Sequence, residues 1–210
     1  MKIVVLVSGG GTNLQALMDA EKAGALHGGV IGAVISDRPG AYALERGGAA
    51  GIRTYIETPD KTLPRKDRRR DLSDRILRIA GKEGAGLIIL AGFLSILEGD
   101  IITAYANRII NIHPSLLPKY GGQGMYGGQV HRAVLAAGEI ESGCTVHLVD
   151  AGTDTGPALI QKKVPVLPGD TPESLAERIH GQEHAALVEA AALMVKRLMK
   201  QPISNRTTGF

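Results

Sequence analysis

Short apolar runs alternate with helix-patterned segments through the first 113 residues, and this alternation limits the fold more than any other feature. The apolar runs are the predicted strands, at residues 2–7, 30–36, 52–56, 87–93 and 108–113. Helical spacing of apolar residues predicts helices between them, at 12–24, 41–51 and 64–84. The run LIILAGF at 87–93 is almost wholly apolar, as expected for a strand covered on both faces. The pattern predicts an α/β fold with an open, mainly parallel twisted sheet flanked by helices.

The second half of the chain has a different pattern. Two predicted strands, at 144–150 and 158–166, follow each other without a helix and could pair as a hairpin or as a split pair. Residues 171–200 have the spacing of one long amphipathic helix, with Thr171 as N-cap and Pro172 at the first helical position. No repeat or linker divides the chain, so we expect a single domain over 1–200 and a flexible polar tail at 201–210.

Composition argues against several functional classes. The single cysteine, Cys144, rules out an intrachain disulfide and favours a reducing, cytoplasmic location. The net charge is only +3 and there is no Trp, which argues against a nucleic-acid partner. No apolar run approaches the roughly 18 residues of a membrane span, and the apolar run at 2–7 is too short for a signal peptide. We therefore expect neither a nucleic-acid partner nor a membrane partner.

The stretch SGGGTNLQAL at 8–17 places a glycine-rich turn between a strand and a helix. Backbone N–H groups at such a helix start favour an anion, and Thr12 and Asn13 add side-chain donors. Leu14 replaces the third glycine of a dinucleotide fingerprint, and the Lys-Ser/Thr of a Walker loop is absent. A single phosphate at Gly11 to Asn13 fits better than a pyrophosphate. The alternative is a tight strand-to-helix turn without a ligand.

The stretch NIHPSLLP at 111–118 ends another predicted strand. Asn111 and His113 are two residues apart, so both face one side of that strand, at a carboxyl end where open α/β sheets place their ligands. Together they could donate hydrogen bonds to a developing oxyanion. Asp154, in a Gly/Thr-rich loop, is the candidate to orient His113 and to favour its protonated form. The alternative is a structural histidine at a strand end.

Other candidate residues have simpler interpretations. His147 alternates with apolar residues and is predicted to be a half-buried, hydrogen-bonded histidine. His180 and His184 have a spacing that could bind metal, but without an HExxH motif we expect no metal site. Cys144 is expected to be a small buried strand residue. The basic cluster 65–71 is predicted to be a solvated helix face, from which Arg65 could still reach an acidic substrate.

Five motifs in this order resemble the phosphoribosylglycinamide formyltransferase family over residues 2 to about 198. They are VSGGGTNLQAL, LAGFLSIL, NIHPSLLPKY, D-x-G-x-D-x-GP and QEHAALV. The resemblance implies a Rossmann-like formyltransferase fold and a cytoplasmic enzyme of purine (IMP) biosynthesis. It implies transfer of a formyl group from the co-substrate 10-formyltetrahydrofolate to the amine of 5′-phosphoribosylglycinamide, with no metal. Its partners would be small molecules, and the enzyme would be a monomer or homodimer.

The resemblance also assigns roles to individual residues. It implies a catalytic trio of Asn111, His113 and Asp154. It also implies that the domain has a phosphate-binding half (1–110) and a catalytic and folate-side half (111–200). It implies that the phosphoribosyl substrate is bound by Gly11, Thr12, Asn13, Glu183 and His180. It implies that the folate is bound by Arg65, Leu94, Ser95, Ile96, Leu97, Asn111, Asp150 and Asp154.

This chain departs from the family pattern at three places. The family commonly has Met and Arg where this chain has Leu94 and Ser95, and Gln or Lys where it has His180. The segment YGGQGMYGGQVHR at 120–132 is longer than in many relatives. We expect its glycine-rich part, 121–128, to be a mobile lid with Met125 and Tyr126 at its tip; rigid turns or a subunit contact are the alternatives.

Two rival functions remain open from the sequence. Another formyl-transfer enzyme, such as a methionyl-tRNA formyltransferase or a formyltetrahydrofolate hydrolase, shares the Asn-x-His and distal Asp; such enzymes have an additional domain, which we expect this chain to lack. A non-enzymatic nucleotide-binding module would explain the glycine loop and would leave the trio without a role.

Overall fold

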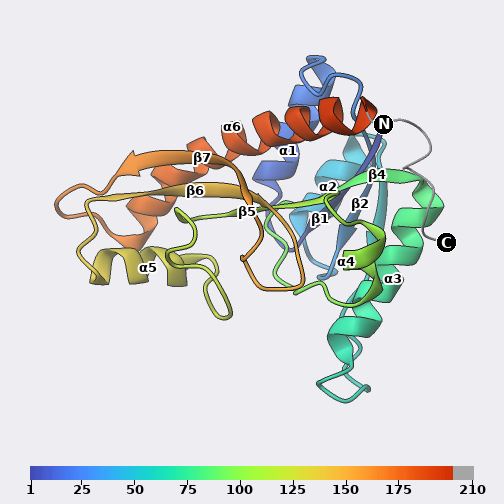
Figure 1. Cartoon of the computed structure of the whole chain (residues 1–210), viewed down its shortest axis with the longest axis horizontal. Helices are drawn as coiled ribbons and strands as arrows, with labels where there is room; N and C mark the ends of the chain where they lie inside the picture. The colour runs from blue at the N-terminus through green and yellow to red at the C-terminus, as the bar shows by residue number, and fades with distance from the viewer. Residues whose placement is uncertain (201–210) are drawn as a thin grey trace.

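The computed structural model describes residues 1–200, so the predicted flexible tail at 201–210 lies outside the described residues. One seven-stranded sheet runs through them in the order β3-β2-β1-β4-β5-β6-β7 (Figure 1). Neighbouring strands from β3 to β5 are parallel, and β6 and β7 are antiparallel. This confirms the predicted mainly parallel sheet. The strands are β1 Lys2–Val7, β2 Val30–Ser36, β3 Arg53–Ile56, β4 Ala85–Leu90, β5 Ile109–His113, β6 Glu141–Leu148 and β7 Ala158–Pro165.

Six helices accompany the sheet in the described part of the chain. They are α1 Thr12–Lys22, α2 Tyr42–Ala49, α3 Arg68–Glu83, α4 Asp100–Ala104, α5 Gly128–Ala136 and α6 Pro172–Met199. The prediction that a helix begins at 64 was wrong by one turn, because Pro64 to Asp67 form a separate turn before α3. The short α4 was not predicted. Within residues 1–200, no helix combines the length and apolarity that a membrane span requires.

Helices cover both faces of the sheet, as the alternation of side chains along β1 requires. Ile3, Val5 and Val7 face a core that α1 and α6 close. Val4 and Leu6 face the opposite core, which α3 and α4 close. Figure 1 shows α6 running along one side of the sheet with α1, and α3 with α4 on the other. All five side chains are fully buried, which explains why the strand is apolar at every one of these positions.

The second half extends the sheet through a hairpin. β6 pairs antiparallel with both β5 and β7, so the open choice between a hairpin and a split pair is settled as a hairpin. α6 packs across both strands, and Thr171 caps it through a reciprocal pair of hydrogen bonds with Ser174, with Pro172 at its first position. The predicted cap is confirmed. The predicted strand at 87–93 ends at Leu90, because the chain turns at Gly92 with φ +75°.

Candidate active site

A cavity of about 860 Å³ opens at the carboxyl ends of β1, β4 and β5. This is the edge at which open α/β sheets bind ligands, and the volume lies in the range of small-molecule sites. The glycine loop that follows β1 forms one wall, and the segment after β4 forms another. His113, Asn111 and Asp154 lie between these walls. The structure therefore brings together the residues that the sequence placed at strand ends.

The imidazole of His113 is held in one orientation. It is 4% exposed, and its Nε2 lies 2.8 Å from the carbonyl oxygen of Tyr120. A carbonyl oxygen only accepts, so Nε2 carries the proton, and Nδ1 is the nitrogen left for chemistry. Tyr120 has φ +56°, and Glu139 accepts hydrogen bonds from its hydroxyl and from Lys119. The turn after β5 thus selects the tautomer of His113.

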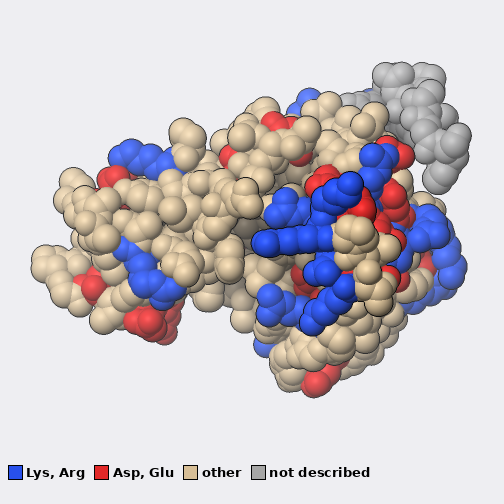
Figure 2. Space-filling model, turned by 90° about the horizontal axis from the view of Figure 1, so that it is seen from below, with Lys and Arg blue, Asp and Glu red and all other residues tan. Residues whose placement is uncertain are grey.

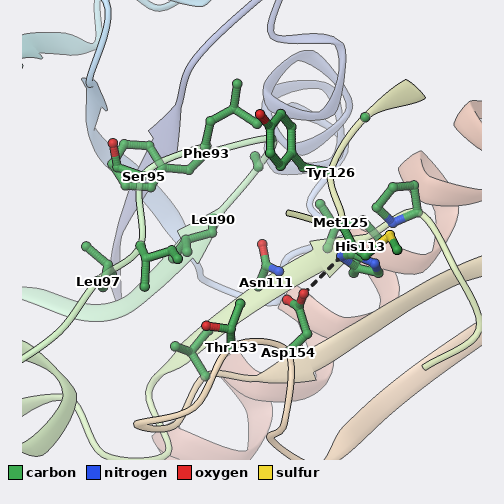
Figure 3. Close-up of a pocket in the computed structure, with 18 of the residues that line it drawn as sticks. Leu90, Phe93, Ser95, Leu97, Asn111, His113, Met125, Tyr126, Thr153 and Asp154 are labelled. Carbon is green, nitrogen blue, oxygen red and sulfur yellow. Dashed lines mark ion pairs between the residues drawn. The ribbon is translucent and has the colours of Figure 1, made fainter. Parts of the chain in front are cut away.

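Asn111 and Asp154 complete the cluster around His113. Asp154 Oδ2 lies 3.5 Å from His113 Nδ1, and Figure 3 shows the Asn111, His113 and Asp154 side chains converging from two sides. Asp154 has φ +58° and accepts a hydrogen bond from Gly122 N–H at 2.9 Å, so its carboxylate is fixed from the glycine-rich segment. The cluster offers an amide, an imidazole and a carboxylate to one point in the cavity.

His147 belongs to this cluster as well. Its Nδ1 donates to the Leu148 carbonyl at 2.8 Å, which leaves Nε2 to accept from Asn111 Nδ2 at 3.1 Å. Nε2 also lies 3.5 Å from Asp154 Oδ1. The predicted hydrogen-bonded histidine is confirmed, but it is fully rather than half buried, and its place in the site was missed. His147 is brought into the site by the antiparallel register of β5 and β6, which pairs it with Asn111.

Burial decides the protonation of His113. Desolvation lowers its pKa below the usual value; Asp154 and the Tyr120 carbonyl raise it without restoring that value. The expectation that Asp154 would keep His113 protonated was therefore wrong in its net result, because desolvation outweighs the carboxylate. Burial raises the pKa of Asp154, but the neighbouring His147 ring, the charge of His113 and the Gly122 N–H outweigh it, so that pKa is lowered. Asp154 is an anion beside a readily deprotonated imidazole.

The segment after β4 forms the apolar wall. Leu94, Ser95, Ile96 and Leu97 all line the cavity, with Phe93 beside them, and Figure 3 shows Phe93, Ser95 and Leu97 across from the His113 cluster. The Ser95 hydroxyl donates to Asp37 Oδ2 at 2.7 Å, and the Leu94 N–H donates to Ser8 Oγ at 2.8 Å. Both bonds fasten the segment to the strand ends beside it.

Arginines form the outer rim of the cavity. Arg65, Arg68 and Arg69 line it, and Figure 2 shows Lys and Arg side chains gathered beside a hollow in this face. Arg68 donates to the carbonyls of Leu63 and Lys61, so its guanidinium holds the turn before α3. Arg65 and Arg69 are exposed. The rim places positive charge at the cavity, and contact of Arg65 with an acidic substrate stays a prediction.

The comparisons with known proteins agree with this architecture. A family model described as Formyl transferase matches residues 1–191. The chain belongs to the formyl transferase family. It is 41% identical over 185 residues to phosphoribosylglycinamide formyltransferase of Escherichia coli (strain K12), covering 88% of this chain and 82% of that protein. The crystal structure of glycinamide ribonucleotide transformylase 1 from Symbiobacterium toebii matches with a TM-score of 0.85 and 40% identity, over 94% of this chain and 88% of that one.

A longer relative contains a similar segment. The chain is 43% identical over 198 residues to trifunctional purine biosynthetic protein adenosine-3 of Drosophila melanogaster. The alignment covers 92% of this chain and 14% of the insect protein, so this formyl transferase spans only a small part of that relative.

Two further polar groups of this formyl transferase lie near the glycine loop. Glu183 is buried, and burial raises the pKa of its carboxyl. His180 is mostly exposed, with Nε2 3.6 Å from Glu183 Oε2. Both line the cavity together with Gly11, Thr12 and Asn13, and the substrate-binding roles of these five residues stay predictions. His131 of α5 also lines it, is buried, and has an Nδ1 without a hydrogen-bond partner within residues 1–200; the sequence analysis missed it.

Asp150 is the one predicted site residue that does not line the cavity. Its Oδ1 accepts from the Gly152 N–H at 3.0 Å and the Thr155 hydroxyl at 2.6 Å. These bonds shape the loop that carries Asp154. In this formyl transferase the Asp150 carboxylate supports the Asp154 loop, and the assignment of Asp150 to folate binding stays a prediction.

The remaining predictions concern Cys144, metal and the glycine-rich segment. Cys144 is fully buried in β6, which confirms the prediction, and burial raises the pKa of its thiol to about 12. Among residues 1–200, no three His, Cys, Asp or Glu side chains gather as metal ligands. Met125 and Tyr126 line the cavity, and Tyr126 is 57% exposed. The mobility of 121–128 stays a prediction.

Proposed function

We propose that this chain is a phosphoribosylglycinamide formyltransferase, which moves a formyl group from 10-formyltetrahydrofolate to the amine of 5′-phosphoribosylglycinamide in purine biosynthesis. The observation that carries the proposal is the position of the Asn111, His113 and Asp154 cluster. It lies in one cavity between a glycine loop suited to a phosphate and an apolar wall with a basic rim. The similarity to enzymes of this name supports the same conclusion.

The chemistry needs no nucleophile from the protein. The substrate amine, once neutral, attacks the formyl carbon, and the carbonyl oxygen gains negative charge. Asn111 donates to this oxygen through the amide N–H that His147 leaves free, and His113 donates through Nδ1–H when it is protonated. The new C–N bond forms as the amine loses a proton, and the bond to N10 breaks as that nitrogen gains one. His113 is the group that transfers this proton.

The Asp154 carboxylate keeps the pKa of His113 closer to a neutral working pH than burial alone would leave it. A proton carrier works best when its pKa lies near the working pH, so that it both accepts and releases a proton. Burial alone would leave His113 neutral, and the Asp154 carboxylate offsets part of that effect. We assign Asp154 the role of orienting the imidazole and stabilising its protonated form during the reaction.

The binding roles follow the walls of the cavity. We assign the substrate phosphate to Gly11, Thr12 and Asn13, and the rest of that substrate to Glu183 and His180. We assign the folate to the aliphatic segment 94–97, with Arg65 facing its acidic end. The enzyme is proposed to act in the cytoplasm on small molecules, as a monomer or homodimer, without a nucleic-acid or membrane partner.

A transfer assay tests the proposal against its rivals. The purified chain is expected to form the formylated product from 10-formyltetrahydrofolate and 5′-phosphoribosylglycinamide, and to be inactive with methionyl-tRNA as acceptor. Release of tetrahydrofolate without an amine acceptor would instead favour a hydrolase. Stabilisation against heat by NAD but not by folate would favour the nucleotide-binding module and contradict formyl transfer.

The glycine loop is tested by Gly11→Val. Gly11 has φ +74°, and a Cβ at this position would lie 2.6 Å from Ala43 Cβ, so valine must displace the loop. KM for the phosphorylated substrate is expected to rise at least about tenfold, since strain of this kind costs about 1–3 kcal/mol. The folate KM is the internal control. An unchanged KM for the phosphorylated substrate would contradict a phosphate at this loop.

A further inference from the structure

All three carbonyl groups of the glycine loop accept hydrogen bonds from the rest of the chain. The Gly9 carbonyl accepts from Ala43 N–H at 3.0 Å, and the Gly11 carbonyl from Gln15 N–H at 2.9 Å. The Gly10 carbonyl accepts from the Nε–H of Arg46 at 2.8 Å. Two of the three donors belong to α2, an element to which the sequence assigned no part in the site. The loop is thus held from behind by a neighbouring helix.

This arrangement sets the direction of the loop amides. In a trans peptide the N–H of one residue points opposite to the carbonyl of the residue before it, and none of these peptides is cis. Because the three carbonyls are anchored on one side of the loop, the N–H groups of Gly10, Gly11 and Thr12 point to the opposite side. Within residues 1–200, none of these three N–H groups donates a hydrogen bond. All three residues line the cavity, so three unpaired donors are available to an anion there.

Arg46 is the side chain that holds the middle peptide. Besides its bond to Gly10, its Nη1 donates to Gln15 Oε1 at 3.1 Å, and its guanidinium lies 4.9 Å from the centre of the Tyr42 ring. Gln15 in turn donates to Asp19 Oδ1 at 3.0 Å. A planar guanidinium held at two donors and one face has a fixed orientation, which the single ammonium of lysine cannot reproduce. Arg46 itself does not line the cavity.

The charge of Arg46 acts through the same peptide. A hydrogen bond from a cation to the Gly10 carbonyl polarises the Gly10–Gly11 peptide, which strengthens its N–H as a donor on the opposite side. We infer that Arg46 is a positioning residue for the substrate phosphate: it aims and polarises the Gly11 N–H from outside the cavity. The inference rests on the proposed phosphate site and adds the part of the fold that creates it.

The test compares Arg46→Gln and Arg46→Lys with wild type, with phosphorylated and dephosphorylated substrate. Arg46→Gln is expected to raise KM for the phosphorylated substrate roughly tenfold, the size of one hydrogen bond to a charged group. Turnover at saturation, the folate KM and the affinity for the dephosphorylated substrate should stay within about twofold. Arg46→Lys keeps the charge and loses the two-point contact, so KM should still rise several-fold.

Arg78→Gln is the matched control, because it removes the same charge from an exposed position on α3 outside the cavity. Gln15→Met, which removes only the outer contact of Arg46, should raise the same KM about threefold and serves if the Arg46 variants fold poorly. Wild-type KM in both Gln15→Met and Arg46→Lys would overturn the positioning role. A similar loss of affinity for the phosphorylated substrate, the dephosphorylated substrate and the folate would also overturn it, because such a loss would indicate general loosening of the structure. Equal affinity of wild type for the two substrates would overturn the phosphate site itself.

Discussion

His113→Ala and Asn111→Ala are each expected to lower kcat by about 10²–10³, or roughly 3–4 kcal/mol of transition-state stabilisation. Each change removes one of the two donors placed to stabilise the oxyanion, and the alanine at 113 also removes the proton carrier. Both side chains point into the cavity from one strand, β5 (Figure 3). Steady-state kinetics with both substrates measures the loss.

Binding should survive in these variants, because the phosphate loop lies on a different strand end. The KM for the phosphorylated substrate is therefore expected to change little. Asn111→Asp is the matched variant: it keeps the shape of the side chain and replaces the donor with an acceptor, so its loss should be at least as large. Turnover near wild type in any of the three would contradict the assigned roles.

Asp154→Asn is expected to lower kcat by about 10², within the range attributed to positioned proton transfer. The sign of the pKa change follows from the contacts of His113. Burial already lowers the pKa of His113, and the Asp154 carboxylate raises it. Removing the negative charge therefore lowers that pKa further, and the titration of His113 moves to lower pH. The fraction of imidazolium at neutral pH falls accordingly. An NMR titration of the His113 ring measures the shift.

Asp150→Asn is the control for this titration. Asp150 carries the same group in the same loop, but it is bonded within the loop and does not line the cavity. Its amide can still accept the bonds from Gly152 and Thr155, so the His113 titration should be close to wild type. If Asp154→Asn leaves the His113 titration where it was, the two residues are not electrostatic partners.

Two members of the trio, Asn111 and His113, could be placed from the sequence. Asn111 and His113 share one face of β5 through the two-residue period of a strand, and Asp154 follows β6. For Asn111 and His113 the prediction needed only the fold class, because open α/β sheets place ligands at the carboxyl ends of their parallel strands. Asp154 is different, because β6 runs antiparallel to β5 and ends at the opposite edge; the loop after β6 brings Asp154 back to within 3.5 Å of His113. His147 could not be placed in the same way, because its contact with Asn111 depends on the antiparallel register of β5 and β6.

The boundaries of helices and strands were harder to predict from the sequence than their existence. The helix predicted from 64 begins at Arg68, because the Arg68 side chain holds the preceding turn through two carbonyls. The strand predicted to 93 ends at Leu90, where the chain leaves the sheet and becomes the apolar wall of the cavity. In both places a specific turn ends the element: one is held by the Arg68 side chain before α3, and the other is made at Gly92 after β4.

The fold class and the kinds of chemistry that the chain carries could be predicted from local sequence patterns. Hydrophobic periodicity, the glycine loop and the Asn-x-His pair are properties of neighbouring residues, so they can be read without knowing what packs around them. Four features depended on groups that folding brings together: the pKa direction of His113, its tautomer, the bonds that hold the Asp150 carboxylate in its loop, and the anchoring of the glycine loop by α2. The physical reason is that desolvation and long-range hydrogen bonds depend on groups distant in the chain, such as Tyr120 beside His113 and Arg46 behind Gly10.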